Sequence, residues 1–323
     1  MKHYPLVSII INNYNYGQFL RDAIDSALNQ TYSQVEVIVV DDGSTDNSLE
    51  IIESYGRLII PVLKENGGQA SAFNAGFGIS RGEIICLLDA DDIFIKDKCE
   101  LIVQRLIENP NYKWLVHKMV HIDSVYNLVT VREANQSLPL LNKSGDYTSK
   151  IKLNKIPFGL PATSSLVFSR ELLNLISPVP IELKIGIDQY LRVAALLKFP
   201  VIYESATLSY QRIHKNNLYT GVDKRTFRYR KIIREMNLII AIKIFNLDKN
   251  QLLSFYFLWG SLKSSLSDND FIFAVRVLRY LLPTMFWGAS FWCTNSFLGN
   301  GQDSCRSPTG KQNLLSTRNV FAN

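Results

Sequence analysis

The chain has 323 residues, of which 47% are hydrophobic and 20% are charged, and its formal net charge is +6. This is the composition of an ordinary globular protein with enough apolar material for a substantial core, in one large domain or two modest ones. Acidic residues outnumber basic ones up to Leu197, and basic residues predominate after it. An acidic front favours a metal site, and a basic remainder favours an anionic partner.

The four cysteines show no paired spacing and no neighbouring ligand pattern; they are Cys86, Cys99, Cys293 and Cys305. We therefore expect reduced, packed thiols in a cytoplasmic protein rather than a disulfide framework. The apolar run near the N-terminus is too short for a signal peptide and no cleavage site follows it, so we predict a strand there.

Short apolar runs alternate with amphipathic segments over the first hundred residues. The apolar runs predict strands that are buried on both faces, over residues 6–11, 35–40, 58–63 and 83–88. Helices are predicted between them, over residues 19–30, around Ile51 and Ile52, and over 69–79. This alternation is typical of an α/β fold with a doubly wound, mainly parallel sheet and helices on both faces.

Carboxylates follow two of the predicted strands. Asp41 and Asp42 come after the second apolar run, and Asp89, Asp91 and Asp92 come after the fourth. In an open α/β sheet, ligands bind at the carboxyl ends of the strands. Asp89 and Asp91 point the same way if the backbone stays extended, and hard oxygen ligands suit Mg²⁺ or Mn²⁺. For an isolated pair of this kind, a solvated acidic turn is the alternative.

Two other phosphate-binding patterns are not supported by the sequence. No G-x-x-x-x-G-K-[ST] motif is present, which excludes a P-loop. The glycines at 76, 78 and 82 superficially resemble a dinucleotide motif. They end a predicted helix instead of opening one, so they cannot place a pyrophosphate on a helix N-terminus.

The middle of the chain continues with further predicted elements: helices over 97–108, 170–176 and 187–197, and strands over 112–123, 162–168 and 201–209. Asp188 lies in the first turn of the helix 187–197, where the helix dipole alone could explain a carboxylate. The polar stretch 127–157 is the natural place for a mobile acceptor loop. His117 and His121 are four residues apart, but a metal role is disfavoured because no Glu stands beside His117.

The last hundred residues differ in character. Six cations between Lys224 and Arg234 make the predicted helix 223–244 basic, which suggests an acidic lipid or another polyanion as partner. Residues 271–298 are aromatic and apolar, but Pro283 and Gly288 interrupt them, so an interfacial or docking segment is favoured over a transmembrane helix. Residues after 299 are polar and are expected to be disordered.

Five segments in this order resemble family-2 glycosyltransferases of the GT-A fold: 7–15 (VSIIINNYN), 27–32 (ALNQTY), 37–46 (VIVVDDGSTD), 66–76 (NGGQASAFNAG) and 82–92 (GEIICLLDADD). The resemblance thins to 164–173, Asp188 and the region of His214 further along the chain. It implies a GT-A glycosyltransferase domain over 1–221, with a nucleotide-sugar-binding half 1–123 and an acceptor half 124–221. A basic and aromatic helical extension over 222–298 and a tail over 299–323 would follow it.

The resemblance also implies roles for particular residues in binding a nucleotide-diphosphate sugar. Asp42 matches the carboxylate that accepts from the base, which is usually uracil. Asp89 matches a residue near the ribose and the metal. The remaining implied donor contacts are Asn13, Tyr14, Asn66, Gly67 and Arg212.

Further residues match the family's metal site and catalytic base. Asp91, with Asp89 and His214, matches the site for Mn²⁺ or Mg²⁺. Asp188 falls where the family has its base, although Ile187 precedes it where a Glu is common. In-line attack by an acceptor hydroxyl activated by this base would invert the anomeric centre.

The resulting hypothesis is an inverting hexosyl- or N-acetylhexosaminyl-transferase. It would use a UDP-sugar, with a saccharide or lipid-linked acceptor, in polysaccharide or glycolipid assembly. We expect a cytoplasmic protein, peripheral at the inner face of the membrane, with no nucleic-acid partner. Two alternatives stay open: a metal-dependent nucleotidyltransferase, and an inactive sugar-nucleotide-binding scaffold.

Overall fold

The computed structural model describes residues 4–129, 143–147, 162–181, 183–215 and 217. All of them belong to one compact unit, Met1–Met285. Its centre is an eight-stranded sheet in the order β3-β2-β1-β4-β7-β6-β8-β5. The strands are β1 Val7–Asn13, β2 Val35–Asp41, β3 Ile60–Leu63, β4 Ile84–Asp89, β5 Ile93–Phe94, β6 Trp114–Ile122, β7 Leu166–Ser169 and β8 Ile202–Arg212.

The N-terminal part of the sheet is parallel, as predicted, and the remainder is mixed. β1 pairs in parallel with β2 and β4, and β2 pairs in parallel with β3. β7 is antiparallel to both of its neighbours, β4 and β6, and β5 is antiparallel to β8. β6 and β8 are again parallel. The predicted α/β class and mainly parallel sheet are therefore confirmed, and the antiparallel β7 is an addition to them.

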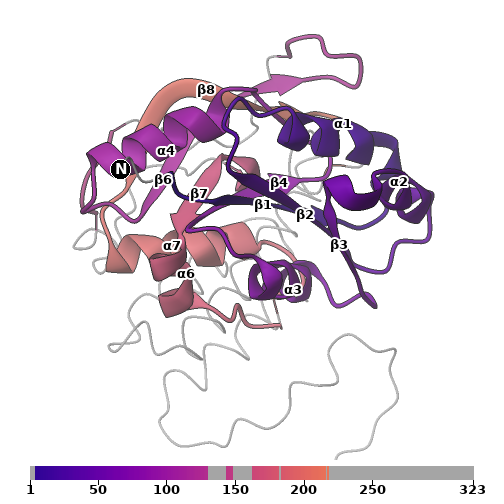
Figure 1. Cartoon of the computed structure of the whole chain (residues 1–323), viewed down its shortest axis with the longest axis horizontal. Helices are drawn as coiled ribbons and strands as arrows, with labels where there is room; N and C mark the ends of the chain where they lie inside the picture. Colours follow the sequence, from indigo (N-terminus) through magenta and orange to yellow (C-terminus); the bar gives the residue numbers. More distant parts are fainter. Residues whose placement is uncertain (1–3, 130–142, 148–161, 182, 216, 218–323) are drawn as a thin grey trace, which may run out of the picture. The chain divides into compact units, whose positions relative to one another are not determined.

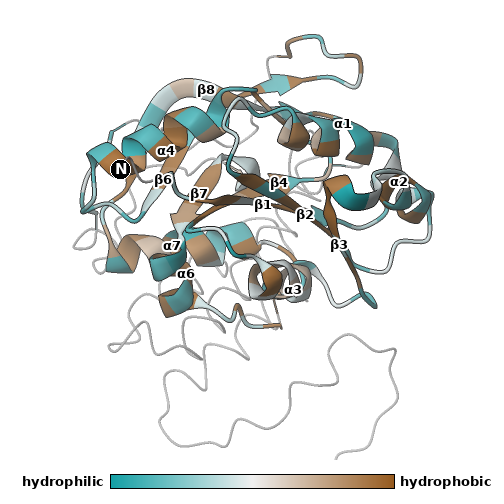
Figure 2. Cartoon of the chain, viewed as in Figure 1, coloured by the Kyte–Doolittle hydropathy of each residue, from teal (hydrophilic) through white to brown (hydrophobic). Residues whose placement is uncertain are grey.

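Helices cover both faces of the sheet (Figure 1). One face carries α1 Gly17–Leu28, α2 Ser48–Ser54 and α4 Lys98–Glu108, and the other carries α3 Gln69–Ile79, α6 Arg170–Ile176 and α7 Ile187–Lys198. Successive residues of a strand point to opposite faces. Thus Ile9 packs on the face covered by α1, α2 and α4, while Ile10 packs on the face covered by α3, α6 and α7. The central strands are mostly apolar, while the helices carry polar residues on their outer sides (Figure 2).

The elements predicted within the described residues are present, with small shifts at their ends. The predicted helices 69–79 and 170–176 coincide with α3 and α6. The predicted strand 162–168 begins as a 3₁₀ turn, Thr163–Ser165, and becomes extended only in β7. The two-residue strand β5 had no sequence signal because it is far shorter than a readable apolar run.

Several predictions concern residues outside the described ranges. These are most of the acceptor loop 127–157, the basic helix 223–244, the aromatic segment 271–298 and the tail 299–323. The proposed division into 1–221, 222–298 and 299–323 remains a prediction. Within the described residues, no helix combines the length and apolar character needed to span a membrane.

The parallel register brings the carboxyl ends of β1, β2 and β4 to one edge. Asn12 is opposite Asp89, and Asn13 is opposite Asp41. The acidic clusters that follow β2 and β4 therefore lie on this same edge, as the sequence predicted.

Candidate active site

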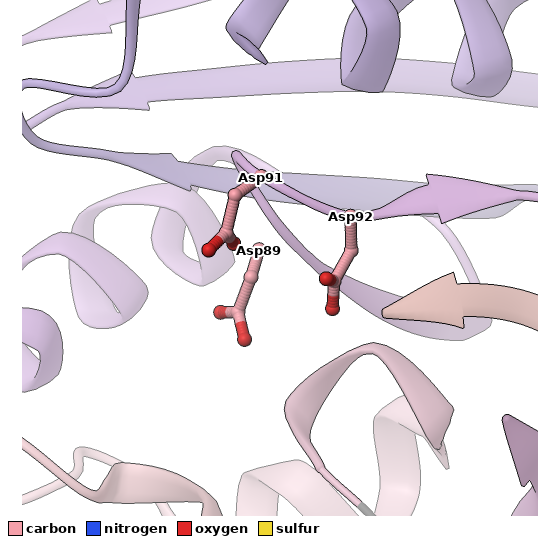
Figure 3. A group of neighbouring side chains, drawn as sticks. All are labelled: Asp89, Asp91 and Asp92. Atoms are coloured by element: carbon pink, nitrogen blue, oxygen red, sulfur yellow. The ribbon is translucent and has the colours of Figure 1, made fainter. Parts of the chain in front are cut away.

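The centre of the candidate site is the turn between β4 and β5, which carries Asp89, Asp91 and Asp92. One carboxylate oxygen from each of these residues lies within 4.8 Å of the others. Figure 3 shows the three side chains extending from this turn, with Asp89 beside Asp91. The turn is closed by the backbone N–H of Asp92, which donates to the carbonyl of Asp89 at 3.0 Å.

The neighbouring carboxylates of this cluster repel one another because they carry like charges. Burial, together with the charges of Asp91 and Asp188, raises the pKa of Asp89 to about 8. Burial and the charges of Asp91 and Asp89 also raise the pKa of Asp92 well above its usual range. A cation bound among these carboxylates would relieve this repulsion. The oxygen donor set therefore fits a hard divalent cation such as Mn²⁺ or Mg²⁺.

The three carboxylates are not equivalent. Asp92 is only 2% exposed and serves as an anchor. Its Oδ2 accepts from the Ser164 hydroxyl at 2.6 Å, and its Oδ1 accepts from the Arg212 backbone N–H at 3.1 Å. Asp89 and Asp91 are partly exposed, so they are the two carboxylates that could reach a ligand.

Ser164 joins the cluster to a buried cation. Its hydroxyl accepts from the Asp89 backbone N–H at 3.0 Å while donating to Asp92. Its carbonyl accepts from Nζ of Lys98 at 2.8 Å, and Lys98 is fully buried. Burial lowers the pKa of Lys98 to about 8, against an opposing influence of Cys86, Cys99 and Asp92. A buried cation behind a buried acidic turn is favourable because each reduces the cost of burying the other.

The end of β8 holds the cluster from the other side. Nε2 of His214 lies 3.0 Å from Oδ2 of Asp91, and the Asn217 amide donates to the same oxygen at 3.2 Å. The His214 ring packs against Phe19 of α1, with ring centroids 4.6 Å apart. The structure thus brings the predicted metal residues Asp89, Asp91 and His214 together, and Asn217 is an additional neighbour that the sequence did not single out.

Arg212 lies beside the cluster but is only 1% exposed. Its guanidinium donates to Asp22 Oδ2 at 2.7 Å and to the Asp91 carbonyl at 3.2 Å. It also lies over the rings of Phe19 and Tyr126. In this conformation Arg212 supports the turn that carries Asp91, and a direct contact with a nucleotide sugar remains a prediction.

Asp188, the predicted base, lies in the first turn of α7, which follows Gly186 in a left-handed conformation (φ 77°). Its Oδ2 pairs with the Arg192 guanidinium one turn further on, at 2.6 Å. Its charge contributes to the raised pKa of Asp89, so the two carboxylates interact electrostatically. Two carboxylates almost 100 positions apart in the chain therefore influence each other, and the role of Asp188 as base remains a prediction.

A second group of predicted residues surrounds Asp42, at the end of β2. Its carboxylate accepts from the backbone N–H groups of Gly67 at 2.9 Å and Gly68 at 2.7 Å, and from Nζ of Lys64 at 2.6 Å. Gly68 has φ 85°, a conformation that favours glycine. The NGG sequence therefore forms a loop that wraps the Asp42 carboxylate.

The remaining predicted donor contacts frame this loop. Asn13 is buried, and its amide donates to Asp41 at 2.7 Å and to Ser44 at 3.1 Å. The Asp42 N–H donates to the Asn13 carbonyl at 2.9 Å. Tyr14, which follows Asn13 in the chain, is exposed. Asn66 is also exposed and precedes Gly67. Asn13 is thus buried beneath the Asp42 loop, while Tyr14 and Asn66 present accessible side chains.

The two histidines that the sequence disfavoured as ligands are elsewhere. Within the described part of the chain, neither His117 nor His121 joins a cluster of possible metal ligands. His117 is buried, and burial followed by the charge of Lys98 lowers its pKa well below the ordinary value. His117 is therefore a neutral histidine packed in the core.

Comparison with known proteins identifies the class to which this fold and site belong. Residues 8–173 match the family model of glycosyl transferase family 2. An uncharacterized glycosyltransferase of Nostoc sp. (strain PCC 7120) is 37% identical over 228 residues, covering 68% of this chain and 68% of that protein. The protein belongs to glycosyl transferase family 2 and is a glycosyltransferase.

Other relatives agree over shorter stretches. An uncharacterized glycosyltransferase of Rickettsia prowazekii is 49% identical over 96 residues, which is 30% of each chain. Among solved structures, residues 1–349 of TarS from S. aureus, determined with UDP, align with a TM-score of 0.52 and 21% identity. That alignment covers 81% of this chain and 72% of the TarS chain, and it supports a GT-A type of fold.

Proposed function

We propose that this glycosyltransferase transfers a sugar from a UDP-sugar to an acceptor hydroxyl with inversion, assisted by Mn²⁺ or Mg²⁺. The observation that carries the proposal is the cluster of Asp89, Asp91 and Asp92 at the carboxyl edge of the sheet. The like charges of Asp91 and Asp188 act on Asp89, so the edge is prepared for a cation. UDP-sugars are the first donors to consider because the resemblance implies them and because TarS was solved with UDP.

In this proposal Asp91 and Asp89 hold the cation. A divalent ion there would supply charge stabilisation to the departing diphosphate, which is the largest electrostatic demand of the reaction. His214 and Asn217 fix Oδ2 of Asp91. Asp92, Ser164 and Lys98 keep the turn rigid from behind, because their hydrogen bonds connect it to the core.

Asp188 is the proposed general base. An acceptor hydroxyl is a weak nucleophile, so a carboxylate within hydrogen-bond reach takes its proton as the glycosidic bond forms. Arg192 orients the Asp188 carboxylate through their 2.6 Å ion pair. Attack from the face opposite the leaving diphosphate inverts the anomeric configuration.

The pathway and location belong to the same proposal. The acceptor is a saccharide or lipid-linked saccharide, the transferred sugar is a hexose or an N-acetylhexosamine, and the product enters a polysaccharide or glycolipid. We propose that the protein works in the cytoplasm, peripheral to an anionic membrane surface. The basic cluster from Lys224 to Arg234 supports this location.

The test is the identity of the released product. The full chain is incubated with a panel of UDP-, GDP- and dTDP-sugars and Mn²⁺, with saccharide and lipid-linked acceptors, and in parallel with nucleoside triphosphates. Release of UDP from one donor supports the proposal, while release of pyrophosphate from a nucleoside triphosphate would indicate a nucleotidyltransferase. Donor binding by calorimetry with no turnover on any acceptor would favour the scaffold.

A further inference from the structure

Lys64 is a polar residue of the site to which neither the family resemblance nor the proposed reaction assigns a role. It directly follows β3, and its Nζ reaches Oδ1 of Asp42 at 2.6 Å. The Lys64 side chain is 22% exposed, whereas that of Asp42 is 5% exposed. Lys64 therefore reaches inward from the surface and lies beside the carboxylate.

The loop around this pair is built to leave room for the ammonium group. A Cβ on Gly67 would lie 2.5 Å from the Ser71 hydroxyl and 3.0 Å from Nζ of Lys64. The absence of a side chain at Gly67 thus allows Lys64 to approach Asp42. The N–H groups of Gly67 and Gly68 fix the carboxylate, so the relative orientation of Lys64 and Asp42 is well defined.

The hydrogen-bonding capacity of the pair is not exhausted. A carboxylate offers about four acceptor positions, and an ammonium group has three donors. Among the described residues, Asp42 accepts from Lys64 and Gly67 through Oδ1 and from Gly68 alone through Oδ2. Lys64 donates to Asp42 and to the Glu65 carbonyl. Within the described part of the chain, one acceptor position on Oδ2 of Asp42 and one N–H of Lys64 are therefore left without a hydrogen bond, and the two groups belong to the same ion pair.

We propose that Lys64 and Asp42 together read the carbonyl–imino edge of the donor's base, with Lys64 as a specificity-determining residue. The inference rests on the proposed function, because it assumes that a nucleotide enters this site. Uracil presents N3–H, which donates to Asp42, next to a carbonyl oxygen, which accepts from Lys64. Cytosine presents an unprotonated N3 that would face the carboxylate and an amino group that would face the ammonium. Adenine has the same unfavourable pattern, whereas guanine offers a matching O6 and N1–H edge on a larger base.

The test compares nucleoside diphosphates, because UDP and CDP differ only in the base edge. Dissociation constants of UDP, CDP and GDP are measured by calorimetry on the full chain with saturating Mn²⁺. The variants are Lys64→Met and Lys64→Gln, with Lys113→Met as a matched control. Lys113 is also a partly exposed lysine in an ion pair, but its partner is Glu171. We expect the wild type to bind UDP roughly ten- to hundredfold more tightly than CDP, because a hydrogen bond to a charged group that forms with uracil and not with cytosine contributes about that much to affinity.

In the Lys64 variants the UDP affinity should fall by about tenfold while the CDP affinity changes little, so the ratio of UDP affinity to CDP affinity should also fall by about tenfold. Lys113→Met should retain the wild-type ratio. An unchanged ratio in both Lys64 variants, or an equal loss for UDP and CDP, would overturn the inference and leave the proposed function intact. Tighter binding of GDP than of UDP and CDP would support recognition of the carbonyl–imino edge and would indicate a GDP-sugar, instead of a UDP-sugar, as the donor. No binding of any nucleoside diphosphate by the wild type would overturn the proposed function, and the inference with it.

Discussion

The imidazole Nε2 of His214 lies 3.0 Å from Oδ2 of Asp91, so the end of β8 is tied to the turn that follows β4. The contact joins residues 123 positions apart in the chain. His214 is also packed against the rings of Phe19 and Tyr16 of the α1 region, which restricts its orientation. The position of Asp91 therefore depends on the aromatic rings that hold His214 as well as on β4, which precedes Asp91.

Replacing His214 with alanine should weaken Mn²⁺ binding by about ten- to a hundredfold, because partners that orient a ligand typically contribute this much to metal affinity. Calorimetric titration of Mn²⁺ in the presence of UDP measures it. His121→Ala is the control, since His121 contacts Gln211 and not the acidic cluster. Equal Mn²⁺ affinities in the two variants would show that His214 has no role at this site.

Asp188→Asn should keep UDP-sugar binding while lowering turnover by about a hundred- to ten-thousandfold, the usual contribution of a general base. Asparagine retains the shape of the side chain but cannot take a proton. Donor affinity by calorimetry and UDP release with acceptor are measured together. Asp97→Asn, at an exposed position before α4, is the control and should be unaffected. Full turnover by Asp188→Asn would remove Asp188 from the mechanism.

Ser164→Ala should lower the free energy of unfolding by about 1–3 kcal/mol, because it leaves the buried Asp89 N–H and Asp92 carboxylate without their partner. It should also raise the KM for the donor, since the turn that carries Asp91 is no longer held. Ser165→Ala is a close control, because among the described residues that buried hydroxyl donates to the Ala162 carbonyl three residues away and not to the acidic turn. Urea denaturation and donor titration test both effects. An unchanged KM would restrict Ser164 to a structural role.

At the opposite edge of the sheet, Glu36 should make stability depend on pH. Burial raises its pKa, but hydrogen bonds from Ser8 and Arg81 outweigh burial and leave the pKa lowered. A carboxyl with a lowered pKa in the folded state stabilises fully above its unfolded pKa, about 4.3, and this stabilisation is lost as pH falls through the folded value. Glu36→Gln should therefore flatten the acid side of the stability curve without altering UDP binding. If the free energy of unfolding fell at acid pH in the variant as it does in the wild type, Glu36 would not be a source of this pH dependence.

The sequence predicts the N-terminal half of this structure well because its signals are local. Apolar runs of β4 and its neighbours mark buried parallel strands, and Asp89 and Asp91 follow directly in the chain. Asp188 and His214 needed a family resemblance, because nothing local indicates that α7 and β8 converge on the same edge. The antiparallel β7 between β4 and β6 could not be derived, since both directions are compatible with a short apolar run.

The buried polar network was beyond sequence reasoning for a physical reason. Lys98 begins a helix that reads as amphipathic, so a solvated lysine is the ordinary expectation. Its partner, the carbonyl of Ser164, is 66 residues away and is brought close only by the folded sheet. Arg212 was predicted to meet the donor, and only the structure reveals its contacts with Asp22 and the rings of Phe19 and Tyr126.

The most direct test of the central claim is the metal dependence of UDP release. Wild-type protein and Asp91→Asn are compared with the preferred UDP-sugar and acceptor, in Mn²⁺ and in excess EDTA. We predict UDP release by the wild type in Mn²⁺, near-complete loss in EDTA that added Mn²⁺ reverses, and loss of at least about a hundredfold in Asp91→Asn. Undiminished release in EDTA, or by Asp91→Asn, would contradict the assignment of this acidic edge as the cation site of the transferase.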